Sequence, residues 1–143
     1  MMKTFYDYLQ EEINGLEGCF DKLIFYIPDF FTLLCDLLRQ NIDSEDRRLI
    51  NSALAYFVVP NDRIYEEIYG PMGYVDDVYV CTLVLNKIQE KYGYEFLEQL
   101  WDHDEELDHV LDYSYNKSLQ LLGDPDLIKE ILKYSGLDHL GTM

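Results

Sequence analysis

The sequence predicts an all-α protein, with about six or seven helices in a single compact domain over residues 1–143 and a central helical hairpin. Three observations support this fold class. Apolar residues recur at helical spacing along most of the chain. The 8 Gly and 4 Pro leave few residues for the many turns of an all-β fold. At 48% hydrophobic and 27% charged residues, the composition is typical of a globular domain.

The apolar spacing predicts the individual helices in order. Pro28 either kinks an apolar stretch or opens a new helix at its first turn. Asp43 or Ser44 caps the helix that follows, and Pro60 ends it. Frequent valine makes a strand an alternative at residues 74–92, but the length of that segment favours a helix. The expected helical segments are 4–14, 19–40 with the interruption at Pro28, 45–59, 74–92, 94–102, 105–122 and 125–134.

The charge of the chain is strongly negative. Eleven Lys and Arg against 28 Asp and Glu give a formal net charge of −17. Direct binding to nucleic acid or to an anionic membrane surface is disfavoured, because both need a basic face. A partner protein with a basic surface remains open, as does the simpler interpretation that acidity maintains solubility.

The sequence predicts a cytoplasmic protein without a transmembrane segment. Its first residues lack the apolar core of a signal peptide, and no run approaches the roughly 18 apolar residues that a membrane span needs. Cys19, Cys35 and Cys81 are odd in number and each has an apolar neighbour, which predicts buried free thiols in a reducing compartment. None has a basic neighbour in the sequence that would activate it as a nucleophile.

The segment from Pro60 to Asp77 holds the unusual residues of the chain. It joins two apolar helical stretches and concentrates Gly, Pro, Tyr and Asp, which is typical of a loop with one fixed path. Tyr suits an interface, although tyrosines also pack over helix ends with their hydroxyls in water. The candidate partner-binding residues are Pro60, Asp62, Tyr65, Tyr69, Gly70, Pro71, Gly73, Tyr74, Asp76 and Asp77.

This segment resembles the YkvA-like family, a bacterial and archaeal domain of unknown function. The similarity lies in an apolar helix ending in Pro60-x-Asp62 and in Gly73-Tyr74-x-Asp76-Asp77 opening a second helix, and it covers about residues 47–88. The chain departs from the family pattern at Tyr65, where a second proline is usual, and its loop is about one residue longer. The resemblance implies a helical hairpin and gives no biochemical activity.

Three carboxylates of this segment form a candidate metal site. If the two helices pack antiparallel, Asp62 approaches Asp76 and Asp77, and converging carboxylates can hold Mg²⁺, Mn²⁺ or Ca²⁺. The alternative is structural, because Asp near a helix N-terminus caps free N–H groups and complements the helix dipole. No other cofactor is expected, and the sequence offers no catalytic residue.

A second candidate surface is the acidic run from Asp102 to Asp112, which includes His103 and His109. Glu106-x-x-His109 is half of a di-iron carboxylate pattern, but the sequence has no second Glu-x-x-His. Such a charge run is usually the solvated face of a helix.

Three functions follow from these features. The leading hypothesis is a non-enzymatic interaction or adaptor module that presents the Pro60–Asp77 loop or the acidic face at residues 102–112 to a basic protein partner. The alternative is a divalent-metal-binding protein or metal-dependent enzyme built on Asp62, Asp76 and Asp77. A third hypothesis is an acidic mimic of nucleic acid that blocks a DNA-binding protein, which requires a continuous acidic stripe.

Overall fold

The computed structural model describes residues 26–58 and 75–137, and every regular element in those two ranges is a helix. The prediction of an all-α fold is confirmed. The helices expected at residues 4–14 and before Tyr26, and the loop expected at residues 61–73, lie outside the described ranges. The six described helices are α2 (Ile27–Leu37), α3 (Ser44–Val58), α5 (Val75–Tyr92), α6 (Tyr94–Glu98), α7 (Leu107–Leu122) and α8 (Pro125–Ser135).

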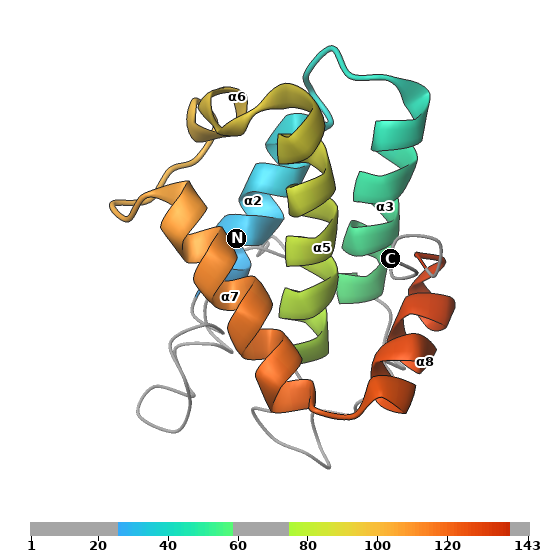
Figure 1. Ribbon diagram of the computed structural model, residues 1–143. Helices are drawn as coiled ribbons and strands as arrows, with labels where there is room; N and C mark the ends of the chain where they lie inside the picture. Colours follow the sequence, from blue (N-terminus) through green and yellow to red (C-terminus); the bar gives the residue numbers. More distant parts are fainter. Residues whose placement is uncertain (1–25, 59–74, 138–143) are drawn as a thin grey trace, which may run out of the picture.

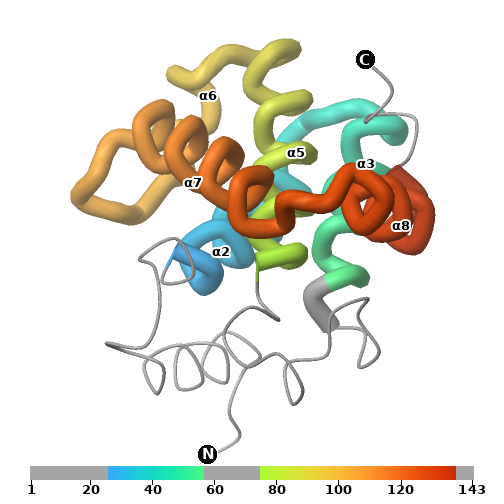
Figure 2. The backbone as a smooth tube through the Cα atoms, turned by 60° about the horizontal axis from the view of Figure 1, so that its bottom comes forward, coloured from blue at the N-terminus to red at the C-terminus, as the bar shows by residue number. Residues whose placement is uncertain are grey.

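Helix α5 is the centre of the arrangement. It contacts all five of the other described helices and lies between α3 and α7 (Figures 1 and 2). Every residue from Val75 to Leu85 is buried, so this half of the helix has no solvent-facing side. A helix that is apolar almost all round is stable only when other helices cover it. Its pairing with α3 gives the helical hairpin expected from the sequence.

Helix α2 begins at Ile27, and Pro28 lies in its first turn. Backbone N–H groups of the first turn have no partner within the helix, so the absence of one at Pro28 costs no hydrogen bond. Of the two predicted roles of Pro28, the start of a helix is therefore the correct one. Phe30, Leu34 and Leu37 are fully buried, and the helix contacts both α3 and α5. The helix ends at Leu37, three residues before the predicted end.

The α2–α3 connection is held by side chains. The carboxylate of Asp43 accepts a hydrogen bond from the backbone N–H of Asp46 at 2.9 Å, so Asp43 is the cap that the sequence left open between Asp43 and Ser44. Lys91 near the end of α5 pairs with both Asp43 and Asp46. The guanidinium of Arg47 donates to the carbonyl of Leu38 at 2.6 Å, which closes the end of α2.

The boundaries of α6 and α7 differ from the predicted ones. A helix was expected at residues 94–102, but α6 ends at Glu98, and α7 begins at Leu107 instead of residue 105. The indole Nε1 of Trp101 donates to the carbonyl of Glu105 at 2.8 Å, which closes a turn between the two helices. We call residues 99–106 the α6–α7 linker.

Glycine and proline separate the last two helices as predicted. Gly123 has φ = 67° at the end of α7, in the region that side chains with a Cβ rarely adopt. Asp124 then accepts the backbone N–H of Asp126 at 2.9 Å, and Pro125 occupies the first turn of α8.

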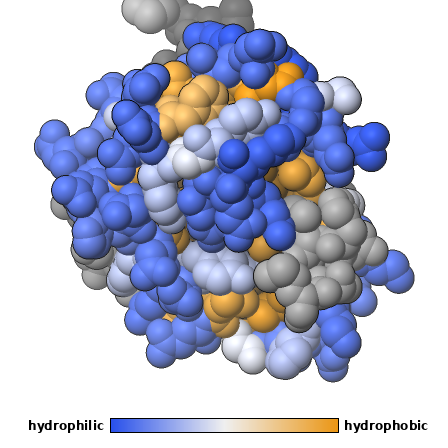
Figure 3. All heavy atoms as spheres, turned by 45° about the horizontal axis from the view of Figure 1, so that its top comes forward, coloured by the Kyte–Doolittle hydropathy of each residue, from blue (hydrophilic) through white to orange (hydrophobic). Residues whose placement is uncertain are grey.

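The buried apolar side chains of the described helices form one cluster, which runs from Tyr26 to Leu137. The face shown in Figure 3 is mostly hydrophilic, with apolar side chains visible in small separate areas. Among the described residues, no helix combines the length and the apolar character that crossing a membrane requires.

Candidate functional site

The predicted central site lies largely outside the described residues. Pro60, Asp62, Tyr65, Tyr69, Gly70, Pro71, Gly73 and Tyr74 belong to the undescribed segment 59–74. Asp76 and Asp77 are described, in the first turn of α5. The approach of Asp62 to these two carboxylates therefore stays a prediction.

Asp76 and Asp77 are both buried, with 0% and 3% of their surface exposed. The hydroxyl of Tyr56 on α3 donates a hydrogen bond of 2.6 Å to Oδ2 of Asp76. Their position in the first turn of α5 also places both carboxylates in the favourable field of the helix dipole. Asp76 thus joins the two helices of the central hairpin at a buried point, while the choice between a metal site and a structural role for these aspartates stays a prediction.

Cys81 lies one turn after Asp77 and is fully buried. Burial, and after it the negative charge of Asp77, raises the pKa of the Cys81 thiol well above its usual value. Cys35 is only half-buried, and burial followed by the charge of Asp36 raises its pKa as well. A thiol with a raised pKa is a poor nucleophile. The prediction of a buried free thiol is confirmed for Cys81 and not for Cys35, which is only partly buried. Cys19 lies outside the described residues.

A hollow of the surface follows the exposed side of α7. We call it the α7 groove; its volume is about 910 Å³. Three tyrosines and three carboxylates line it, together with His109 and with Lys117 farther along α7. The tyrosines are Tyr26, Tyr94 and Tyr113, and the carboxylates belong to Glu105, Asp108 and Asp112.

Contacts between distant parts of the chain hold one end of this groove. The hydroxyl of Tyr26, just before α2, donates to Oε2 of Glu105 in the linker at 2.7 Å. Burial, and after it the negative charges of Asp108 and Asp112, raises the pKa of Tyr94 above its usual value. Tyr94 therefore lies in a partly buried part of the groove wall, close to the carboxylates of Asp108 and Asp112.

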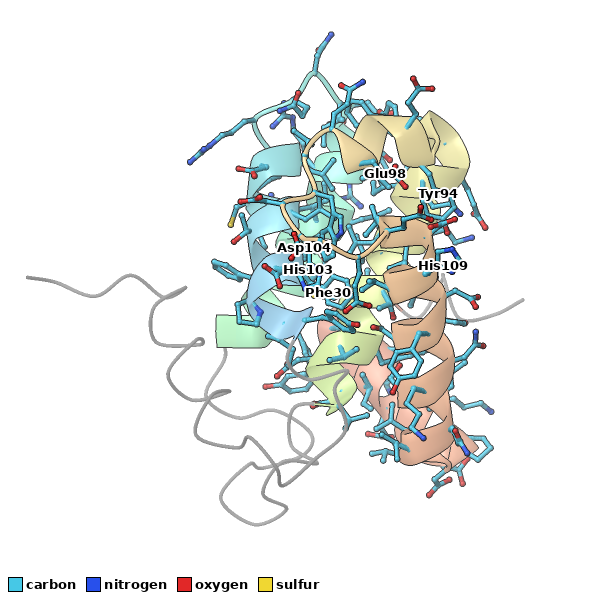
Figure 4. All side chains as sticks on the ribbon, turned by 90° about the vertical axis from the view of Figure 1, so that its left-hand side faces the viewer. Phe30, Tyr94, Glu98, His103, Asp104 and His109 are labelled. Atoms are coloured by element: carbon cyan, nitrogen blue, oxygen red, sulfur yellow. The ribbon has the colours of Figure 1, made fainter. Side chains whose placement is uncertain are left out.

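The α6–α7 linker is fixed against α2 by aromatic contacts. The His103 ring lies 5.5 Å from the rings of both Tyr26 and Trp101, and its Nδ1 accepts the backbone N–H of Glu105 at 3.0 Å. Figure 4 shows His103 on the α2 side of the linker near Phe30, with Tyr94 and His109 on the other side. Nε2 of His103 lies 3.8 Å from the carboxylate of Asp29. His103 therefore positions the linker, and with it the groove carboxylate of Glu105.

Glu106, Asp108 and His109 form an exposed cluster at the start of α7. Nε2 of His109 lies 3.2 Å from Glu106 and 3.9 Å from Asp108, and the spacing would admit a divalent cation. The cluster sits at a helix N-terminus, where the dipole favours anions and opposes a cation. Its high exposure agrees with the solvated face that the sequence predicts.

Sequence reasoning singled out the acidic side of the groove and missed its aromatic side. The run at residues 102–112 was visible as a charge pattern. Tyr26 and Glu105 are 79 residues apart, so only the packing of α2 on the linker brings them together. The abundance of Tyr, 13 in the chain, was the one available signal.

The described part of the chain is helical, and comparison with known proteins finds similarity to a family model and to a protein without an assigned activity. Residues 46–83, which include most of α3 and the first half of α5, match a family model described as "Protein of unknown function (DUF1232)". This match covers nearly the same part of the chain as the YkvA-like resemblance at about residues 47–88, while the YkvA-like name and motif stay a prediction.

The chain is also 33% identical over 133 residues to "Uncharacterized protein ORF9" from Methanothermobacter thermautotrophicus, and the alignment covers 92% of this chain and 90% of that protein. The chain belongs to the same family as this archaeal protein. No solved structure is significantly similar to it.

Proposed function

We propose that this protein is an interaction module that binds a basic segment of a partner protein in the α7 groove. The observation that carries the proposal is the combination of three carboxylates and three tyrosines around one hollow of about 910 Å³. Tyrosine supplies large contact area at a small loss of side-chain freedom, and carboxylates attract and orient Lys and Arg. The net charge of −17 would steer a basic partner toward the protein over a long range.

The positions of the charged residues suggest the arrangement of the partner. Asp108 and Asp112 are four residues apart on α7, which separates them by about 6 Å along the helix axis. Lys or Arg at positions i and i+4 of a partner helix match this separation. Lys117 lies farther along the same groove and would repel a basic side chain. We therefore expect the basic residues of the partner at the linker end of the groove.

A binding titration with a defined probe tests this proposal. The probe is a fluorescein-labelled amphipathic helical peptide with Lys and Arg at i, i+4 spacing and an apolar strip beside them. We expect saturable anisotropy changes with the wild type. The double variant Asp108→Asn/Asp112→Asn should bind at least about tenfold more weakly, because both charge partners are lost.

A second double variant separates the groove from the overall charge. Glu45→Gln/Asp126→Asn also removes two negative charges, but from exposed first-turn positions of α3 and α8 that lie outside the groove. This control should bind within about twofold of the wild type, because screening weakens exposed charges beyond about 8–10 Å. Equal losses in both double variants would mean that only net charge matters. Absence of binding to the wild type would refute the proposal.

A divalent-cation site at Asp76 and Asp77 is the second candidate function. It is favoured by the burial of two adjacent carboxylates in the first turn of α5, since carboxylate oxygens are ligands that Mg²⁺, Mn²⁺ and Ca²⁺ prefer. A cation that binds only the native protein raises the unfolding midpoint. Thermal unfolding with and without each cation tests this function, and Asp76→Asn should abolish any rise. If no cation shifts the wild type, the two aspartates act as a structural brace.

A further inference from the structure

A second hollow lies between α3 and α8 and differs in chemistry from the α7 groove. We call it the α3–α8 pocket; its volume is about 510 Å³. In Figures 1 and 2 α8 runs beside α3, on the side of α5 opposite to α7. None of the residues that line this pocket is acidic, although the chain has 28 Asp and Glu, and two of them are arginines. The charged side chains that line the pocket are therefore all positive, although the protein as a whole is acidic.

Helical spacing brings the polar side chains of this pocket together. Ser44, Arg48 and Ser52 follow one another at intervals of four residues, and Asn51 lies three residues after Arg48, so these side chains share one face of α3. The opposite wall is the last turn of α8, whose Tyr134 is 46% exposed. Among the residues whose side-chain burial is described, Tyr134 is the one large hydrophobic residue that is exposed.

The two arginines of the pocket have different roles. The guanidinium of Arg47 donates to the carbonyls of Leu38 and Gln40 at 2.6 and 2.8 Å, so it is engaged at the end of α2. Arg48 makes no hydrogen bond or ion pair with any residue in the described part of the chain. Its planar group remains available to an oxyanion, which a guanidinium binds through two parallel hydrogen bonds.

The two tyrosines of the pocket also differ in their contacts and exposure. The Tyr56 hydroxyl is engaged with Asp76, and its ring contacts the ring of Tyr134 at 6.0 Å with an interplanar angle of 80°. This edge-to-face contact supports Tyr134 from one side while nearly half of its surface stays open. An exposed ring beside an unengaged guanidinium suits a ligand that is planar at one end and anionic at the other.

We propose that the α3–α8 pocket binds a small ligand that carries an oxyanion, either phosphate or carboxylate, next to a planar ring. Arg48 binds the oxyanion, Ser52 and Asn51 supply further donors, and Tyr134 contacts the ring. This site is independent of the α7 groove, which has the opposite charge and uses none of these residues.

Ligand titrations followed by amide NMR spectra test the proposal. The probes are phenyl phosphate and benzoate, which share a ring and differ in the anion, inorganic phosphate, which lacks the ring, and phenol, which lacks the anion. We expect saturable shifts around Arg48 and Tyr134 with phenyl phosphate or benzoate below about 10 mM, and weaker binding of inorganic phosphate and phenol. The tighter of the two ring-bearing anions identifies the oxyanion.

Variants decide whether the pocket is responsible. Arg48→Gln and Tyr134→Ala alter exposed side chains and should each weaken the tighter probe at least about fivefold, while the amide spectrum confirms that the fold is intact. Arg39→Gln is the matched control, because Arg39 is also an exposed arginine and does not line the pocket. No saturable shift with either ring-bearing anion would overturn the proposal. Equal weakening by Arg39→Gln and Arg48→Gln would overturn it as well.

Discussion

The hydrogen bond between Tyr56 and Asp76 should contribute measurably to stability, and Tyr56→Phe isolates its contribution. This substitution removes one oxygen atom and leaves the ring in its contact with Tyr134. The hydroxyl lies 2.6 Å from Oδ2 of Asp76, at a point where Asp76 is completely buried. Water cannot readily replace the lost donor there, so the cost includes the poorer solvation of a buried carboxylate.

Removing the donor from a buried acceptor costs about 1–3 kcal/mol, and we expect Tyr56→Phe to lower the free energy of unfolding by that amount. The entropy of unfolding at the midpoint is about 2.1 cal/mol/K per residue, or about 0.3 kcal/mol/K for this chain. The midpoint should therefore fall by about 3–10 °C.

Urea unfolding followed by far-ultraviolet circular dichroism measures this change directly. Tyr134→Phe is the matched control, since the Tyr134 hydroxyl makes no hydrogen bond with a described residue and the side chain is 46% exposed. The control should change the free energy by less than about 0.5 kcal/mol. A loss of less than about 0.5 kcal/mol for Tyr56→Phe would refute the reasoning, because the buried contact would then have no net effect.

Two further predictions concern the cysteines and the pH dependence of stability. In a Cys19→Ala/Cys35→Ala variant the remaining Cys81 should not react with Ellman's reagent in the native protein but should react fully in urea, because it is buried and its pKa is raised; rapid native reaction would contradict this. The Lys91 ammonium and the Asp46 backbone N–H lower the pKa of Asp43 from 3.8 to about 2. A lowered folded-state pKa stabilises the protein above the unfolded pKa, and this stabilisation is lost as the pH falls from about 4 to about 2. Urea unfolding across this interval should show a smaller loss for Lys91→Met than for the wild type, and identical pH profiles would exclude this ion pair as a source.

The fold was predictable because its strongest signals are local. Helical apolar spacing lies within each segment, and the start at Pro28 and the cap at Asp43 depend on residues a few positions away. The end of α6 was predicted less well. The apolar pattern continues to Trp101, but the indole N–H of Trp101 donates to the carbonyl of Glu105 within the linker. His103 of the same linker contacts Tyr26, which is distant in the sequence, and the apolar spacing carries no sign of this contact.

The candidate site was predictable only in part, for the same physical reason. The carboxylates of the α7 groove appear in the sequence as one acidic run, whereas Tyr26 and Tyr94 reach the groove from other elements. The α3–α8 pocket has no sequence signal of its own, because Arg48 and Tyr134 are 86 positions apart and no motif connects them. Burial of Asp76 and Asp77 was likewise not visible, since adjacent aspartates usually indicate an exposed turn.

Mapping the bound basic peptide by amide NMR tests the central claim most directly. The account predicts that perturbations concentrate along the exposed side of α7, on the linker near Glu105 and at Tyr94. At the same peptide concentration they should be much smaller in Asp108→Asn/Asp112→Asn, which binds at least about tenfold more weakly. Residues of the α3–α8 pocket should remain unchanged. Perturbations spread evenly over exposed carboxylates on all helices would contradict the account, because the groove would then be one part of a uniformly acidic surface.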